Sequence, residues 1–170
     1  MRQQIIISGL GGQGALTLTR LLAEAALGLG LPVLTSETHG MAQRGGTVIS
    51  MVKVGPFRGP LIPLGEADVG FFLHAGNLPV HRPYLRPDGL LLVNTAAPGD
   101  YLALDALALA LDAGLAPVAA NLILLGFAAG REALFTGAAA LEEVIRAVTP
   151  PRFREDNLRA FALGREAAAP

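Results

Sequence analysis

The sequence predicts an α/β fold in which helices cover both faces of a mostly parallel sheet that contains at least one antiparallel strand. Short apolar runs typical of buried strands alternate along the chain with longer segments of helical periodicity. A glycine-rich turn joins the first expected strand to the first expected helix. Only about ten residues separate the second and third expected strands, too few for a crossover helix, so an antiparallel neighbour is expected there.

The element boundaries follow from apolar periodicity and from turn residues. The expected strands are residues 3–8, 32–36, 47–54, 68–73 and 89–94. The expected helices are residues 15–26, continuing to Gly28 or Gly30, a short segment at 78–85, then 105–114 with Asp105 as N-cap, 118–129, 138–148 and, after Pro150-Pro151, 155–167.

The composition indicates one domain, residues 1–170, that works as part of a larger assembly. The formal net charge of −1 gives no reason to expect nucleic acid or an anionic membrane as a partner. Without cysteine, the chain can form neither a disulfide nor a thiolate-bound iron–sulfur cluster. Hydrophobic residues make up 52% of the chain and charged residues 16%, against about 25% charged in a typical domain. We therefore expect apolar surface in an interface, and a homo-oligomer when the chain is isolated.

A membrane span is the competing explanation for this hydrophobicity. Residues 113–130 form an 18-residue run without charge, at the lower limit of spanning length. Gly114, Pro117, Asn121 and Gly126 interrupt the run, so it is predicted as the end of one helix followed by a second, buried helix. The first apolar run stops at Gly9, so it is too short for a signal peptide. These patterns predict a cytoplasmic protein.

The stretch Gly9-Leu10-Gly11-Gly12-Gln13-Gly14 matches GxGxxG between a strand and a helix, the context that predicts a Rossmann-like three-layer fold. Gly9 is expected to allow a tight turn, Gly11 to let another group approach the backbone, and Gly14 to let the helix pack on the strand. The amides at the helix start favour a phosphate or carboxylate. A turn that binds nothing would need the same glycines, so both interpretations stay open. The candidate binding residues are Gly9, Gly11, Gly12, Gln13 and Gly14.

A polar loop, residues 37–46, follows the second expected strand and is predicted to lie at the same edge of the sheet as the glycine turn. Its histidine, glutamine and arginine side chains can bind oxygen atoms, and its glycines leave the backbone accessible. The alternative is a structural loop whose arginine pairs with an acid. The candidate binding residues here are His39, Gln43, Arg44, Gly45 and Gly46.

Glu37 introduces a different class of function. It ends the second expected strand 23 positions after Gly14, which fits the acid that binds a ribose in nicotinamide enzymes. The chain offers no obvious acid or base for the substrate side of such a reaction. The histidines, His39, His74 and His81, have no partners at metal-ligand spacing. The sequence therefore predicts no catalytic residue and no metal site.

Several segments taken together resemble the gamma domain of 2-oxoacid:ferredoxin oxidoreductases. The resemblance begins with Gly9–Gly14 and with the HGMAQRGG loop, residues 39–46. The loop is most similar to the small beta subunit of the indolepyruvate type, whereas pyruvate and 2-oxoglutarate types tend to show a tyrosine-glycine-proline version. The chain departs from the indolepyruvate pattern at residues 74–77. The remaining matching segments are residues 65–68, 121–126 and 157–164.

The resemblance implies a division of labour. Thiamine diphosphate and iron–sulfur clusters are expected on catalytic partner subunits, which decarboxylate a 2-oxoacid oxidatively, pass electrons to ferredoxin and transfer the acyl group to coenzyme A. The gamma chain packs on those subunits and is expected to be inactive alone. The glycine turn and Arg44 are expected to face the cleft between subunits and to receive coenzyme A phosphates or a partner's carboxylate.

Two other functions stay open on the sequence. One is a stand-alone Rossmann protein that binds NAD or FAD, with Glu37 on the ribose. The other is a purely architectural subunit in which the glycine turn binds no ligand.

Overall fold

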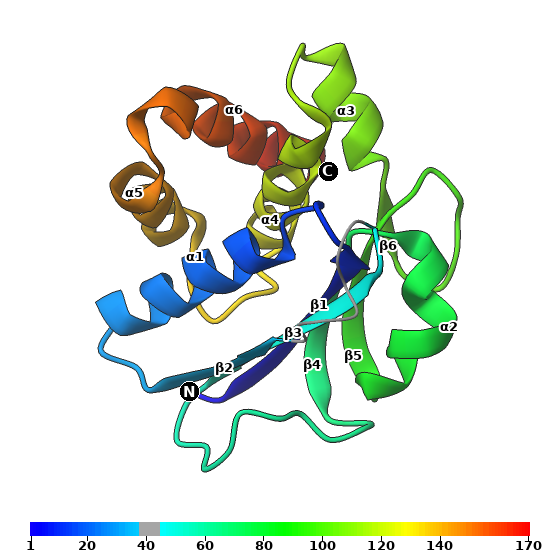
Figure 1. Cartoon of the computed structure of the whole chain (residues 1–170), viewed down its shortest axis with the longest axis vertical. Coiled ribbons are helices and arrows are strands. Elements are labelled where there is room, and N and C mark those ends of the chain that lie inside the picture. Colours follow the sequence, from blue (N-terminus) through cyan, green and yellow to red (C-terminus); the bar gives the residue numbers. More distant parts are fainter. Residues whose placement is uncertain (38–44) are drawn as a thin grey trace.

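The structure, a computed structural model, describes residues 1–37 and 45–170 and shows a mixed sheet with helices on both faces (Figure 1). The six-stranded sheet of these residues has the order β2-β3-β1-β4-β5-β6. β3 is antiparallel to both of its neighbours, and the other neighbouring pairs are parallel. The strands are β1 (Gln3–Leu10), β2 (Val33–Glu37), β3 (Thr47–Val54), β4 (Ala67–Phe72), β5 (Leu85–Asn94) and β6 (Leu102–Leu104). The predicted fold class, including its antiparallel strand, is confirmed.

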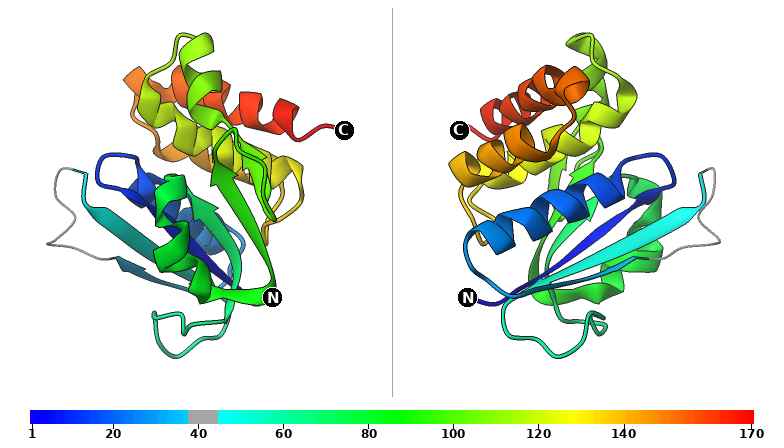
Figure 2. Two further views of the ribbon diagram at one scale, coloured as in Figure 1. Left: turned by 90° about the vertical axis from the view of Figure 1, so that its right-hand side faces the viewer. Right: turned by 60° about the vertical axis from the view of Figure 1, so that its left-hand side comes forward.

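Two hydrophobic cores lie on opposite faces of the sheet. Alternate residues of β1 enter different cores: Ile5 and Ile7 face the larger core, and Ile6 faces the smaller one. Figure 2 shows α1, α4, α5 and α6 on the face of the larger core and α2 on the other face. The helices are α1 (Ala15–Gly28), α2 (Leu78–His81), α3 (Ala106–Asp112), α4 (Ala120–Gly130), α5 (Ala138–Val148) and α6 (Pro151–Ala167), with 3-10 turns at 75–77, 82–84 and 117–119.

The long uncharged run of the sequence has its explanation in α4, which is enclosed on all sides. Every residue from 120 to 129 is buried, because the sheet lies beneath α4 and α6 packs on its outer side. A helix surrounded by protein needs no polar face. No helix in the described part of the chain is long and apolar enough to cross a membrane.

Two glycines let α4 and α6 pack with their backbones in contact. A Cβ atom on Gly164 would overlap the carbonyl oxygen of Ile123, and a Cβ on Gly126 would overlap the carbonyl oxygen of Phe161. Both residues belong to segments that carry the family resemblance, 121–126 and 157–164. Their absent side chains set the separation of the two helices.

Most expected elements are present, with several differences. β5 begins at Leu85 instead of residue 89, and the expected 78–85 helical segment divides into α2 and a 3-10 turn at 82–84. β6 was not predicted, because its three residues carry too little periodicity to distinguish a strand from a loop. The last helix begins at Pro151 instead of residue 155, since proline is well accommodated in the first turn of a helix. The expected 118–129 helix divides into a 3-10 turn and α4. Asp105 does cap α3, accepting a hydrogen bond from the Ala108 amide at 3.0 Å.

The α4–α6 contact leads to a stability prediction. Gly164→Ala is expected to lower the free energy of unfolding by about 3 kcal/mol, because the added methyl group forces two backbones apart. Gly28→Ala is the matched control: it adds the same atom to a helical glycine that has no described residue within 4 Å of the new Cβ, so stability should stay the same or rise by up to about 1 kcal/mol. Urea unfolding followed by circular dichroism measures both. Equal stability of the two variants would contradict the packing argument.

Candidate functional site

The glycine turn lies where the carboxyl ends of the parallel strands meet. It joins β1 to α1, while Leu73 follows β4 and Asn94 ends β5 at the same edge. Gly12 and Gly14 adopt left-handed backbone angles, with φ of 93° and 84°. This conformation favours glycine over residues with a Cβ atom. The turn therefore occupies the edge at which open α/β sheets bind ligands.

Gln13 fastens the turn to the sheet. Its Oε1 accepts a hydrogen bond from the Leu10 amide at 2.7 Å, and its Nε2 donates to the Leu73 carbonyl at 3.3 Å. Gly9 was expected to form a tight turn, but it lies inside β1. A Cβ atom there would come within 3.0 Å of Gln13 Oε1. The expectation for Gly9 is wrong: this glycine makes room for the side chain that holds the turn.

No side chain of the described residues caps the first turn of α1. Gly14 is the N-cap residue, so the first amides of the helix have no intrahelical acceptor and no capping side chain from the part of the chain that the structure describes. Asn121 of α4 donates from Nδ2 to the Gly14 carbonyl at 3.1 Å, and a Cβ on Gly14 would overlap that amide group. Gly14 was expected to let α1 pack on its strand; it instead lets α1 approach α4.

The end of the polar loop contacts the glycine turn, at the edge of the sheet where its position after the second strand predicted it. The Gly11 amide donates to the Gly46 carbonyl at 2.9 Å, and Gly45 has a φ of 87°. The amide of Gly11 is therefore already hydrogen-bonded within the protein, to the carbonyl of Gly46. The other candidates of this loop, His39, Gln43 and Arg44, lie outside the described residues.

A pocket of about 190 Å³ opens beside the turn. Asn94, which sequence reasoning missed, lies in its wall and accepts hydrogen bonds from the amides of Ala106 and Leu107 at 2.9 and 3.3 Å. An asparagine ending a parallel strand is the signal that could have found it. The pocket is smaller than the roughly 300–1,000 Å³ of complete small-molecule sites. Its lining residues are Gly12, Gln13, Leu73, Asn94, Leu107, Pro117, Val118, Ala120 and Asn121.

A buried polar network supports the turn from the other face of the sheet. Ser8 Oγ lies 2.6 Å from His81 Nδ1, and Asn77 Nδ2 donates to Ser8 Oγ at 3.0 Å and to the Gly9 carbonyl at 2.8 Å. Because Asn77 donates to Ser8, the serine hydroxyl can donate to the imidazole of a neutral histidine. Burial lowers the pKa of His81, which agrees with the neutral form. Ser8 is fully buried, so this Ser–His pair is structural and is not a nucleophile.

Known proteins with related sequences and folds identify the family. The family model described as pyruvate ferredoxin/flavodoxin oxidoreductase matches residues 4–167. The indolepyruvate oxidoreductase subunit IorB of Archaeoglobus fulgidus is 35% identical, over 96% of this chain and 94% of that protein. The gamma subunit of a keto/oxoacid ferredoxin oxidoreductase from Geobacter sulfurreducens has a TM-score of 0.78 at 27% identity, with 98% of each chain covered.

This chain belongs to the pyruvate ferredoxin/flavodoxin oxidoreductase family. It is a small subunit homologous to the gamma and IorB subunits of these enzymes, as the sequence resemblance indicated. The fold also recurs in the 2-oxoglutarate:ferredoxin oxidoreductase of Magnetococcus marinus, at 19% identity and a TM-score of 0.78, where it aligns with 31% of a longer chain.

The topology of this oxidoreductase subunit differs from a dinucleotide-binding sheet at Glu37. In such sheets β2 lies beside β1. Here the antiparallel β3 lies between them, so Glu37, at the end of β2, is one strand farther from the glycine turn. The described residues contain no group of three side chains able to hold a metal ion.

The neutral His81 makes a testable contribution to the pH dependence of stability. The pKa of His81 is lower in the folded subunit than the roughly 6.5 of an unfolded chain. Below about pH 6.5 the unfolded state therefore binds a proton that the folded state does not. As the pH is lowered from about 6.5, the free energy of unfolding decreases by at most about 1.4 kcal/mol per pH unit, until the pH is below the pKa of His81 in the folded state. His81→Gln is expected to remove this slope.

Urea unfolding at pH 5, 6, 7 and 8 measures the effect. The matched control is His74→Gln, which changes a half-buried histidine in the same connection and leaves the Ser8–His81 pair in place. It should retain the slope of the unmodified chain. If the stability of His81→Gln depends on pH as that of the unmodified chain does, His81 is not the cause of the pH dependence.

Proposed function

We propose that the glycine turn of this subunit forms one wall of a coenzyme A site. The catalytic subunits of the oxidoreductase complete that site. The open approach to Gly12 at the uncapped start of α1 is the observation that carries the proposal. No atom of the described residues, 1–37 and 45–170, lies within 4 Å of the position of a Cβ on Gly12. A phosphate can therefore reach the backbone amides there, where the helix dipole also favours negative charge.

The size of the pocket supports a shared site. At about 190 Å³ it can hold part of a molecule as large as coenzyme A. The Magnetococcus enzyme that shares this fold was solved with 2-oxoglutarate, coenzyme A and succinyl-CoA bound. In the proposed complex, Gly12 and the first amides of α1 bind phosphate. Arg44, Gln43 and His39 of the polar loop, residues 37–46, are proposed as further donors. Gln13 and Asn121 keep the turn in position.

The reaction itself belongs to the partners. When bound, coenzyme A provides the thiol that accepts the acyl group after decarboxylation. This chain has no cysteine to bind an iron–sulfur cluster through thiolates, so the clusters are assigned to the catalytic subunits, together with thiamine diphosphate. Ferredoxin then receives electrons through the complex and does not need to contact this subunit.

The substrate is proposed to be an aryl 2-oxoacid such as indolepyruvate. The supporting observation is the similarity to the indolepyruvate oxidoreductase subunit IorB, at 35% identity over nearly the whole chain. The departure at residues 74–77 lies partly in the Ser8–Asn77–His81 network beneath the sheet, away from the pocket. This departure therefore gives no reason to prefer another substrate.

Coenzyme A binding has a matched pair of glycine variants. Gly12→Ala places a methyl group at the proposed phosphate position, and Gly30→Ala does the same at an exposed glycine that also has positive φ and open surroundings. Both substitutions introduce backbone strain of about 1–2 kcal/mol. Only Gly12→Ala, and Arg44→Ala with it, is expected to raise the KM for coenzyme A, by about tenfold or more, a cost of about 1.4 kcal/mol in binding.

The measurement is steady-state turnover of the reconstituted complex with a viologen dye as electron acceptor. If Gly12→Ala and Arg44→Ala leave both the KM and assembly of the complex unchanged, the coenzyme A assignment fails. If they weaken assembly alone, the subunit is architectural.

The substrate and the division of labour are tested by purification with a tagged chain. A partner containing iron and thiamine diphosphate should co-purify, and the complex should oxidise indolepyruvate faster than pyruvate or 2-oxoglutarate. The isolated chain should oxidise none of them and should self-associate in size-exclusion chromatography. A rise in melting temperature with NAD or FAD, but not with coenzyme A, would favour the stand-alone Rossmann alternative.

A further inference from the structure

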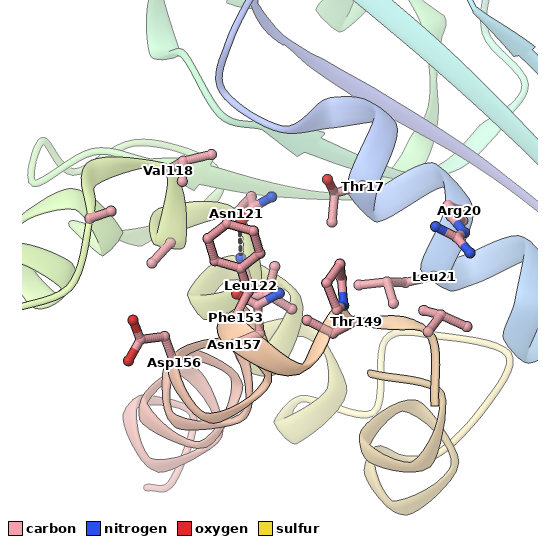
Figure 3. Close-up of a pocket in the computed structure, with 14 residues that line it drawn as sticks. Thr17, Arg20, Leu21, Val118, Asn121, Leu122, Thr149, Phe153, Asp156 and Asn157 are labelled. Atoms are coloured by element: carbon pink, nitrogen blue, oxygen red, sulfur yellow. Dashed lines mark hydrogen bonds between the residues drawn. The ribbon is translucent and has the colours of Figure 1, made fainter. Parts of the chain in front are cut away.

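A second, larger depression lies on the helical side of the molecule, separate from the turn. It has a volume of about 370 Å³ and lies between α1, the 117–122 segment and the corner that joins α5 to α6 (Figure 3). We name it the helical groove. Its side walls include Val118 and Phe153, which are 47% and 48% exposed although both are large and apolar. Arg20, Asn121 and Asp156 also line the helical groove.

The helical groove has opposite charges at its two ends. Arg20, on α1, and Asp156, on α6, lie at opposite sides of Figure 3 with Phe153 between them. Both side chains are exposed, and neither forms an ion pair with any residue that the structure describes. Because Arg20 is positive and Asp156 is negative, a charged segment that binds in the helical groove is favoured in one orientation over the reverse.

The apolar surface continues from the helical groove to the glycine turn. Val118 and Asn121 line both the helical groove and the pocket beside Gly12, and Leu107 of α3 lines that pocket. Leu16 is half exposed and lies one helical turn before Arg20, so it shares a face of α1 with that arginine. A continuous exposed apolar surface of this kind marks an interaction site. This apolar surface adjoins the glycine turn, which the proposed function places against a catalytic subunit.

We propose that the helical groove is the docking site of the catalytic subunit, which inserts an apolar segment between Val118 and Phe153. A carboxylate of that segment faces Arg20 and a cation faces Asp156, so the charges set the direction in which it lies. The inference rests on the proposed function, in which a catalytic subunit closes the site at Gly12. Any chain that covers Gly12 and Leu107 reaches Val118, because Val118 forms part of both depressions.

Continuity with the pocket beside Gly12 favours this occupant over a second copy of the chain. Val118 lines both depressions, so the catalytic subunit that covers Gly12 in the proposed function also reaches the helical groove. A second copy seated in the groove has no corresponding requirement to reach Gly12. Buried apolar anchors in such pockets contribute most of the binding energy of an interface.

The test is the affinity of this subunit for the catalytic subunit, measured by biolayer interferometry. Arg20→Glu and Val118→Asp are expected to raise the Kd by at least tenfold, and Arg20→Glu should also reduce the dependence of the association rate on salt. Arg58→Glu and Leu64→Asp are the matched controls. Both residues are exposed and lie in the β3–β4 connection, at the end of the molecule opposite α3 and α6 (Figure 1).

Thermal unfolding identifies variants that fail to fold, and Arg20→Glu, on an exposed helix face, provides a second test if Val118→Asp unfolds. Wild-type affinity in both groove variants overturns the proposal. Loss of self-association with intact partner binding also overturns it, because the occupant is then a second copy. Coenzyme A affinity is measured separately, so an unchanged KM in Gly12→Ala together with weakened assembly in Arg20→Glu refutes only the coenzyme A site.

Discussion

The backbone contact between α4 and α6 is the constraint on which the functional face depends. Gly126 and Gly164 carry no side chains where the two helices cross, and a methyl group at either position would overlap a backbone oxygen. At this separation, α6 covers the outer side of α4 and its first turn comes to the edge of the helical groove. A wider separation would uncover α4, whose buried residues are apolar apart from Asn121, and would displace Phe153 and Asp156 from the groove.

The start of α4 transmits this constraint to the glycine turn. Asn121 donates to the Gly14 carbonyl, so the position of α1 is tied to that of α4. Gln13 ties the same turn to the end of β4, and Asn77 ties the preceding Gly9 carbonyl to the network beneath the sheet. The backbone amides of α1 are thereby held in one place before any ligand or partner arrives, which reduces the entropy lost on binding. The site and the proposed docking surface share this support.

Much of the fold could be predicted because its signals are local. Continuous β-branched residues predicted β1, glycine punctuation predicted the turn, and the short separation of β2 and β3 predicted their antiparallel pairing. The contacts that hold the site are long-range and could not be read from spacing. Gly9 and Gly14 match the motif, but their neighbours are Gln13 and Asn121, and the second of these lies 107 residues away from Gly14. Ser8 and His81 meet only because α2 folds beneath the sheet.

By itself, the sequence determined the class of fold, the family and the dependence on partners. The ordered motifs carried the family, and the lack of cysteine with an excess of apolar residues indicated a subunit. Tertiary structure alone decided which apolar residues remain exposed. Val118 and Phe153 resemble core residues in sequence, yet the packing of α1, α4 and α6 leaves both at the surface. Burial depends on which helix faces meet, and that choice is made by contacts between segments far apart in the chain.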